Sequence, residues 1–187
     1  HQYEADDLIG SALWGLRSHG FRGVIVSADK DFGQLLGEFD EQWDFAKNVR
    51  WGATGVFERL GVHPHQVADY LALCGDAVDN IPGVPGIGAK TAAALLGHFG
   101  SLDAVLERID EVPYLRIRGA AACAVRLREH ADQALLCRRL TRIALDIAVA
   151  DTADALSRRA GDASAIDDLC ERIRFGPLTR TRLRALI

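Results

Sequence analysis

Hydrophobic positions in the first part of the chain change between helical and strand-like spacing. Apolar residues recur at near-helical intervals over 4–20, which predicts a helix that ends at a glycine. The β-branched run at 21–28 predicts a buried strand. Four further elements complete this part: a short helix over 29–36, a strand over 42–47, and helices over 53–61 and 64–75. Such alternation of helices and strands is typical of an α/β fold.

The pattern becomes helical after a break. Residues 76–87 hold two prolines and two glycines, so we expect no regular structure there. The alanine-rich segment 89–100 predicts a helix that ends at a glycine, and 101–110 predicts a helix capped by a serine. The remainder has helical patterns and one strand-like stretch at 141–149.

We therefore expect an α/β domain over 1–75 and a mostly helical domain over 76–187. Charge is also divided unevenly along the chain. Residues 1–110 carry 16 acidic and 8 basic side chains, whereas 111–187 carry 10 acidic side chains and 14 arginines. The arginine-rich part fits either phosphate contacts or solvated helix faces.

Composition narrows the protein class. A chain of 187 residues has no apolar run long enough to span a bilayer and no export signal, so we expect a cytoplasmic protein. The four cysteines form no C-x-x-C pair, which argues against zinc or disulfides and favours reduced, mostly buried thiols. The chain begins at His1 rather than Met, with a dense motif close behind, so we expect an upstream segment to be missing.

Acidic side chains of the first part gather in short groups. Seven such side chains form three groups: Glu4, Asp6 and Asp7; Asp29 and Asp31; Asp76 and Asp79. Separately, each group has a structural explanation as a helix cap, a charged first turn or a turn former. If the groups converged, repulsion would raise their pKa values unless cations were bound. All-oxygen clusters suit Mg²⁺ or Mn²⁺, and two such ions form a common device for hydrolysing phosphodiesters.

The segment GVPGIGAKT (83–91) resembles a nucleotide-binding phosphate loop only superficially. Ala89 stands where that loop requires lysine, and the preceding segment is not a strand. A tight hairpin around Ile87 fits better, with the following helix offering free backbone N–H groups to a phosphate. Lys90 and Thr91 would add to that contact, and such a grip suits a DNA backbone. The simpler alternative is a turn that leads into a helix.

Three segments carry a resemblance to a known family. EADD, SADKDFGQLL and LCGDAVDNIPGVPGIGAKTAAALL resemble, in order, the 5′-nuclease family. It includes the 5′–3′ exonuclease domain of bacterial DNA polymerase I and stand-alone bacterial flap endonucleases. The resemblance implies a Rossmann-like, PIN-like α/β nuclease core and a helical DNA-binding module with a helix–hairpin–helix-type motif at 76–98. The family's first strand, an early aspartate and basic residues all precede EADD and are not in this chain.

The resemblance also implies roles for individual residues. Two divalent ions, Mg²⁺ or Mn²⁺, would be held by Glu4, Asp6, Asp7, Asp29, Asp31, Asp76 and Asp79. Catalysis would rest on Asp6, Asp7, Asp29 and Asp31. A K⁺ ion would be bound by main-chain groups of Leu73, Cys74, Pro82, Val84 and Ile87. The DNA backbone would be contacted by Gly86, Ile87, Gly88, Ala89, Lys90 and Thr91.

The resulting hypothesis is a monomeric, structure-specific 5′ nuclease. It would cut DNA at junctions between single strand and duplex, in replication or repair, by a two-metal mechanism. Two alternatives remain open. One is a DNA-binding module without catalysis, in which the acidic residues are structural. The other is a phosphatase that uses Asp29 and Asp31 as nucleophile and acid/base.

Overall fold

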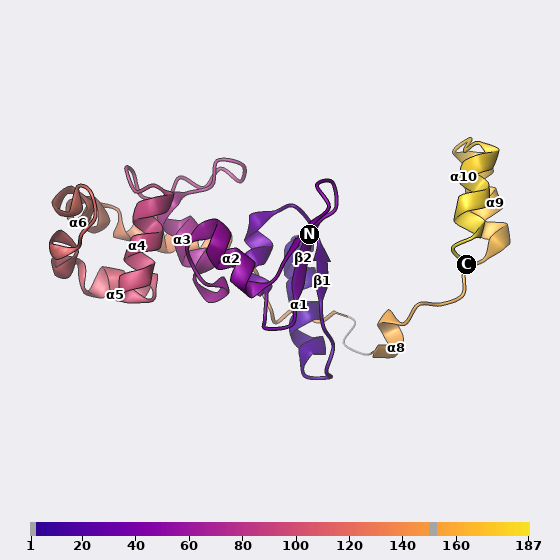
Figure 1. Cartoon of the computed structure of the whole chain (residues 1–187), viewed down its shortest axis with the longest axis horizontal. Helices are drawn as coiled ribbons and strands as arrows, with labels where there is room; N and C mark the ends of the chain where they lie inside the picture. The colour runs from indigo at the N-terminus through magenta and orange to yellow at the C-terminus, as the bar shows by residue number, and fades with distance from the viewer. Residues whose placement is uncertain (1–2, 150–152) are drawn as a thin grey trace. The chain divides into compact units, whose positions relative to one another are not determined.

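The computed structural model describes residues 3–149 and 153–187. The chain divides into two compact units, His1–Val149 and Ala150–Ile187 (Figure 1). The predicted division near residue 75 falls inside the first unit. Helix α3 (Val67–Cys74) contacts the 3₁₀ helix η1 (Lys30–Leu35) from the N-terminal part and both α4 (Ala89–Phe99) and α7 (Ala131–Thr141) from the helical part.

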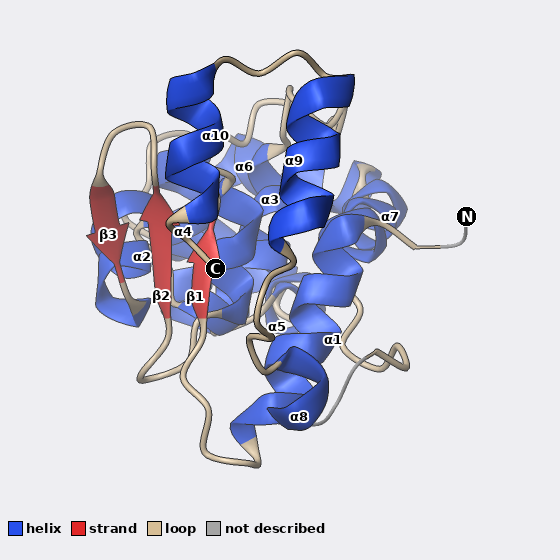
Figure 2. Cartoon of the chain, turned by 90° about the vertical axis from the view of Figure 1, so that its right-hand side faces the viewer, coloured by secondary structure: helices blue, strands red, loops and turns tan. Residues whose placement is uncertain are grey.

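The N-terminal part of the first unit is built around a small mixed sheet. Strand β1 (Val24–Val26) pairs in parallel with β2 (Glu41–Asp44), which pairs antiparallel with β3 (Val49–Trp51) (Figure 2). The helical elements of this part are α1 (Ala5–Arg17), η1, α2 (Ala53–Leu60) and the 3₁₀ helix η2 (Pro64–Gln66). The α/β character predicted from the hydrophobic pattern is confirmed.

One expectation for the sheet needs correction, and one strand was not predicted. The run 21–28 was predicted as a buried strand, but only Ile25 of β1 is buried, while Val24 and Val26 are 45% and 59% exposed. β1 is an edge strand, and only its Ile25 face packs on the core. The sequence pattern also gave no sign of β3, whose three residues are too few to display a period.

The helical part of the first unit follows the prediction closely. Its further elements are α5 (Leu102–Glu107), the 3₁₀ helix η3 (Ile109–Tyr114) and α6 (Ala120–Glu129). Gly100 ends α4 at a positive φ, and the Ser101 hydroxyl accepts a hydrogen bond from the Ala104 N–H, so both predicted caps are confirmed. The irregular segment 76–87 is also confirmed, apart from a single bridge between Asp76 and Ile81.

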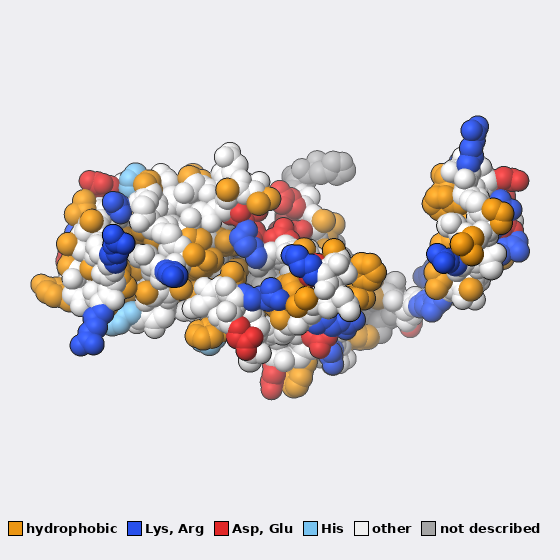
Figure 3. Space-filling model, turned by 45° about the horizontal axis from the view of Figure 1, so that its top comes forward, with side chains coloured by type: hydrophobic (Ala, Val, Ile, Leu, Met, Phe, Trp, Pro, Cys, Tyr) orange, Lys and Arg blue, Asp and Glu red, His pale blue; other side chains and the backbone are white. Residues whose placement is uncertain are grey.

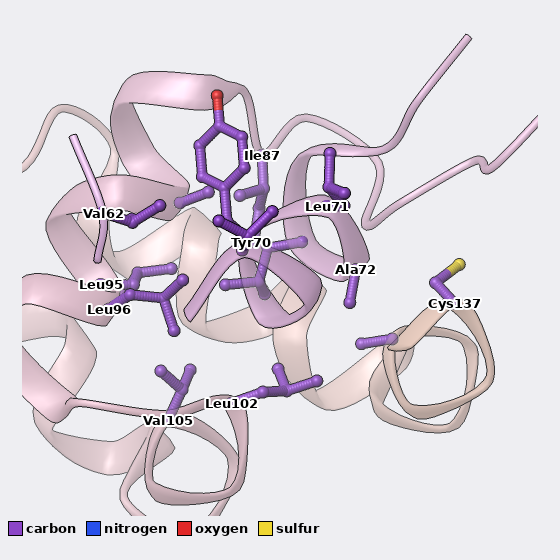
Figure 4. Close-up of a cluster of buried hydrophobic side chains, with 14 of the residues drawn as sticks. Val62, Tyr70, Leu71, Ala72, Ile87, Leu95, Leu96, Leu102, Val105 and Cys137 are labelled. Carbon is purple, nitrogen blue, oxygen red and sulfur yellow. The ribbon is translucent and has the colours of Figure 1, made fainter. Parts of the chain in front are cut away.

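The core of this unit joins α3 to the helices around it. Leu71, Leu95, Leu96 and Leu102 are fully buried, and Figure 4 shows them in one cluster of buried side chains that come from α3, α4 and α5. Burying one such leucine contributes about 2 kcal/mol. The packing fixes the orientation of α3 and α4, and therefore of the loop between them.

The stretch 141–149 was predicted to be strand-like, and this prediction is wrong. Thr141 ends α7, and residues 142–149 run along α1 without entering the sheet. Their backbone groups bond to side chains instead: Ala144 N donates to Asp7, Ile147 N donates to the Ser11 hydroxyl, and that hydroxyl donates to Ala144 O. Side-chain partners thus replace the strand partners that the pattern suggested.

The second unit consists of three helices in its described residues: α8 (Ala153–Leu156), α9 (Ala163–Arg172) and α10 (Pro177–Arg184). Arg184 of α10 pairs with Asp167 of α9, and Cys170 of α9 is buried. All four cysteines are free thiols and three are buried, as predicted. Among the described residues, no helix has the length and apolar character needed to cross a membrane.

Candidate metal centre

Acidic side chains from all three sequence groups meet at one cleft of the first unit. The cleft has a volume of about 410 Å³. Its lining is formed by Glu4, Asp6, Asp29, Asp31, Asp79, Asn80, Ile81, Leu140 and Thr141. Figure 3 shows acidic side chains gathered around a hollow on this unit. The sequence spacing permitted these three groups to converge, and the structure shows that they do.

Local structure explains how each group reaches the cleft. Asp29 lies three residues after the end of β1 and caps η1, because its Oδ1 accepts a hydrogen bond from the Asp31 N–H at 3.0 Å. The cap turns the chain so that both carboxylates line the cleft. On the opposite side, paired hydrogen bonds between Asp76 and Ile81 close a loop that carries Asp79. Asp29 therefore both caps η1 and lines the cleft.

The tightest group of potential ligands comprises Asp31, Asp76 and Asp79. One carboxylate oxygen from each lies within 4.8 Å of the other two. The Oδ1 atom of Asp31 is buried and has no hydrogen-bond partner among the residues that the structure describes. A buried carboxylate oxygen without a partner is costly unless a cation or a proton satisfies it. The donor set therefore fits a hard divalent ion.

The pKa values respond to this crowding. Burial, and then the charge of Asp29, raise the pKa of Asp31 to about 7, against the opposing effect of Lys30. Burial and the neighbouring Asp29 and Glu4 also raise the pKa of Asp6. Burial and Asp76 raise the pKa of Asp79. These directions match the expectation that converging carboxylates resist ionisation when no metal ion is bound.

Asp76 shows the opposite shift because it has a cation beside it. Its side chain is only 4% exposed, and the Lys30 ammonium donates a hydrogen bond to its Oδ2. Although burial opposes ionisation, this bond and a bond from the Val78 N–H hold the pKa of Asp76 below its ordinary value. Sequence reasoning missed Lys30, although it lies between two of the predicted aspartates.

Asp7 does not line the cleft. Its Oδ1 accepts a hydrogen bond from the Ala144 N–H at 2.8 Å, and its Oδ2 accepts one from the Glu4 N–H at 3.0 Å. The second bond is half of a capping box at the start of α1. The structure thus gives this carboxylate two backbone hydrogen bonds and no place in the lining of the cleft.

The predicted hairpin forms next to this loop. Ile87 is buried, as predicted, and its N–H donates to Val84 O at 3.0 Å. Gly83 has a φ of +63°, and a Cβ atom there would lie 2.3 Å from the nitrogen of Gly75. The end of α3 and the hairpin therefore approach each other more closely than any other residue would allow.

Two side chains from α6 and α7 hold the hairpin in place. Gln133 donates a hydrogen bond to Gly83 O, and Arg126 donates one to Gly86 O at 3.3 Å. Their positions, about 40 to 50 residues downstream, carry no local signal, so sequence reasoning could not find them. Gly88 starts α4 without a side-chain cap. Lys90 is exposed in the first turn and Thr91 is half-buried.

The main-chain groups predicted to bind K⁺ come from two segments that lie side by side. Val84 N donates to Leu73 O at 2.9 Å, and this bond joins the end of α3 to the hairpin. Cys74 and Pro82 lie at the same close approach. A Cβ atom on Gly75 would meet Pro82 O, and a Cβ atom on Gly83 would meet the carbonyl carbon of Cys74. The geometry thus brings main-chain groups of the two segments together.

A family model described as the C-terminal SAM fold of the 5′–3′ exonuclease matches residues 62–164, more than half of the chain. The chain belongs to the 5′–3′ exonuclease family. Among curated proteins of this kind, a 5′–3′ exonuclease of Buchnera aphidicola is 38% identical over 146 residues, covering 78% of the chain and 51% of that protein. A flap endonuclease Xni of Aeromonas hydrophila is 42% identical over 145 residues, covering 77% and 52%.

Other relatives and solved structures extend the exonuclease-family match. The DNA polymerase I of Rhizobium leguminosarum is 35% identical over 95% of the chain, which covers 17% of that protein. The zinc-bound 5′-exonuclease of bacteriophage T5 has a TM-score of 0.64 at 25% identity, over 74% of the chain and 49% of the phage protein. A T5 flap endonuclease variant in a pseudo-enzyme-product complex with DNA and metal ions scores 0.61 at 26% identity. The chain thus spans about half the length of the stand-alone nucleases that it matches.

Proposed function

We propose that this chain forms part of a structure-specific 5′ nuclease that hydrolyses DNA phosphodiesters at junctions between single strand and duplex. The observation that carries the proposal is the convergence of Glu4, Asp6, Asp29, Asp31 and Asp79 on one cleft, with Asp76 beside it. Support also comes from relatives described as 5′–3′ exonucleases and flap endonucleases. The proposed fold is a PIN-like core followed by a helix–hairpin–helix-type module.

We assign two divalent ions, Mg²⁺ or Mn²⁺, to the acidic cleft. Asp31, Asp76 and Asp79 would hold one ion, because their oxygens lie within 4.8 Å of one another and Asp31 Oδ1 accepts no hydrogen bond from the described residues. Glu4, Asp6 and Asp29 would hold the other on the facing side of the cleft. Bound there, the ions would supply a water of lowered pKa and stabilise the charge on the attacking and leaving oxygens. A T5 exonuclease with bound divalent metal ions is consistent with this assignment.

The hairpin would hold the duplex while the acidic cleft acts on the 5′ strand. The first turn of α4 has no side-chain cap. The N–H groups of Thr91 and Ala92 bond to Gly88 O, so those of Ala89 and Lys90 would be offered to a phosphate oxygen. Lys90 would add a positive charge and Thr91 a hydroxyl to the same contact. Main-chain carbonyls at the approach of α3 to the hairpin would take the proposed K⁺. Such contacts position DNA without reading its sequence.

The test is cleavage of a labelled 5′-flap duplex by the protein expressed from its full coding sequence. Asp29→Asn removes a charge from the cleft, yet an asparagine can still cap η1. We expect Mg²⁺-dependent cleavage to fall about 100-fold or more, with binding of the same DNA retained. Asp132→Asn, an exposed acid in the first turn of α7, is the matched control and should cleave normally.

Three results separate the alternatives. Undiminished cleavage by Asp29→Asn would contradict the catalytic assignment. Flap binding by the wild-type protein without cleavage in Mg²⁺ or Mn²⁺ would favour the non-catalytic DNA-binding module. Release of phosphate from a small phosphomonoester, in place of flap cleavage, would favour the phosphatase.

A further inference from the structure

Lys30 brings a positive charge into the tightest part of the acidic cluster. Its ammonium donates a hydrogen bond to Asp76 Oδ2 and lies 3.8 Å from Asp31 Oδ1. Within the described residues, no other lysine or arginine forms an ion pair with Asp31, Asp76 or Asp79. The ammonium therefore lies among the oxygens that would hold a divalent ion.

Both oxygens of Asp76 are occupied in this arrangement. Oδ1 accepts a hydrogen bond from the Val78 N–H at 3.1 Å, and Oδ2 accepts the bond from Lys30. The carboxylate is buried, so water does not offer it further partners. A metal ion that binds Asp76 through Oδ2 must take the place of the lysine.

We propose that Lys30 is an internal counter-ion that offsets part of the negative charge of this cluster in the metal-free protein and is displaced when a divalent ion binds Asp31, Asp76 and Asp79. The inference rests on the proposed function for the presence of that ion. Lys30 itself can move, because its side chain is 39% exposed and extends from the first position of η1. A long, flexible ammonium can leave for solvent at little cost in packing.

The proposal makes the lysine and the metal ion competitors. With Lys30 present, three carboxylates and one ammonium carry a charge of −2, so binding must also break an ion pair. Without the lysine, the same carboxylates carry −3 and no pair has to be broken. Removal of this charge should therefore strengthen divalent-ion binding. A lysine that only held Asp76 in position for the metal would have the opposite effect.

Calorimetric titration of the protein expressed from its full coding sequence with Mn²⁺ tests this competition. Lys30→Met keeps much of the side-chain length and removes the charge. We expect it to bind Mn²⁺ about tenfold more tightly than the wild-type chain. Lys47→Met is the matched control, because Lys47 also pairs with an aspartate, Asp44 at 3.1 Å, but neither lines the acidic cleft. Its affinity should be unchanged, and an unchanged or weakened affinity in Lys30→Met would overturn the proposal.

A second measurement needs no variant. The chain has three lysines, Lys30, Lys47 and Lys90. Trace acetylation followed by mass spectrometry reports how freely each ammonium reacts. Saturating Mn²⁺ should raise labelling of Lys30 relative to the other two, and unchanged labelling under saturation would contradict displacement. If neither the wild-type chain nor Lys30→Met binds Mn²⁺, the metal assignment of the proposed function fails as well. Binding with unchanged Lys30 labelling overturns the counter-ion alone.

Discussion

Replacing Asp31 with asparagine should stabilise the metal-free protein at neutral and alkaline pH. The pKa of this carboxyl is about 7 in the fold, against an ordinary value of 3.8. At about 1.4 kcal/mol per pKa unit, the difference lowers the free energy of unfolding by about 4 kcal/mol once Asp31 is fully ionised. The side chain is only 15% exposed, so solvent screens little of this cost. Asparagine has nearly the same shape and cannot ionise.

The direction of this pH dependence follows from whether the folded or the unfolded state binds the Asp31 proton more tightly. Between about pH 4 and pH 7 the folded protein keeps the Asp31 proton while the unfolded chain releases it. Stability contributed by this group is therefore present at low pH and is lost as pH rises through that window. Asp31→Asn should match the wild-type chain near the acid end of the window and exceed it increasingly up to about pH 7, after which the difference becomes constant.

Urea unfolding in the presence of EDTA measures this difference. All three tryptophans, Trp14, Trp43 and Trp51, lie in the first unit, so their fluorescence reports the unfolding of that unit. The titration would be repeated at about pH 5, 6, 7 and 8. Added Mn²⁺ should stabilise the wild-type chain by about 2.7 kcal/mol at a hundredfold excess over its dissociation constant, and Asp31→Asn by less.

Asp40→Asn is a control with the opposite sign. Although Asp40 is buried, its carboxylate accepts hydrogen bonds from the N–H groups of Gly23 and Gly37 and pairs with Arg17, which together hold its pKa below the ordinary range. Asp40 is ionised at every pH of the assay, so its contribution to the free energy of unfolding is fully present throughout. Asp40→Asn should therefore lower that free energy by about 3 kcal/mol at every pH. The reasoning about Asp31 is refuted if Asp31→Asn is no more stable than wild type at about pH 8, or if their difference does not change with pH.

Two further substitutions test the division of roles around the cleft. Asp7→Asn should lower the free energy of unfolding by about 1 kcal/mol, because it weakens the capping box and the bond to Ala144 N. Calorimetry should show unchanged Mn²⁺ affinity, and a large loss would make Asp7 a ligand. Gly83→Ala should cost about 1 to 3 kcal/mol in urea unfolding, because φ is +63° and the new Cβ meets the Gly75 backbone. Gly88→Ala, in open space with φ of −95°, should be nearly neutral, and equal losses in both variants would contradict this argument.

Helix ends were predictable because the groups that specify them are close in sequence. Ser101 caps α5 by a hydrogen bond to a residue three positions away, and Gly100 adopts a positive φ that few other residues tolerate. The same holds for Asp29 at the start of η1. The hairpin was predictable for a related reason: Ile87 is apolar between two glycines and turns inward.

The segment 142–149 was mispredicted because its conformation depends on distant partners. Its alternating apolar residues fit a strand, yet its N–H groups bond to Asp7 and Ser11, more than 130 positions earlier in the chain. A small residue, Gly10, lets this segment approach α1, where a Cβ atom would lie 2.7 Å from Ile143. None of these contacts leaves a trace in the local hydrophobic pattern, which therefore indicates only that the segment is extended.

The same dependence on distant contacts separates Asp6 from Asp7. The two residues are adjacent and chemically identical, and sequence reasoning gave them one role. In the fold Asp6 faces other carboxylates across the cleft and its pKa is raised, whereas Asp7 accepts two backbone hydrogen bonds. Through these two bonds Asp7 stabilises the start of α1, whereas Asp6 and Asp31 oppose folding until a cation arrives. Metal binding must therefore offset the free energy that it costs to ionise these carboxylates in the fold. Their raised pKa values and positions identify the site more sharply than acidic composition does.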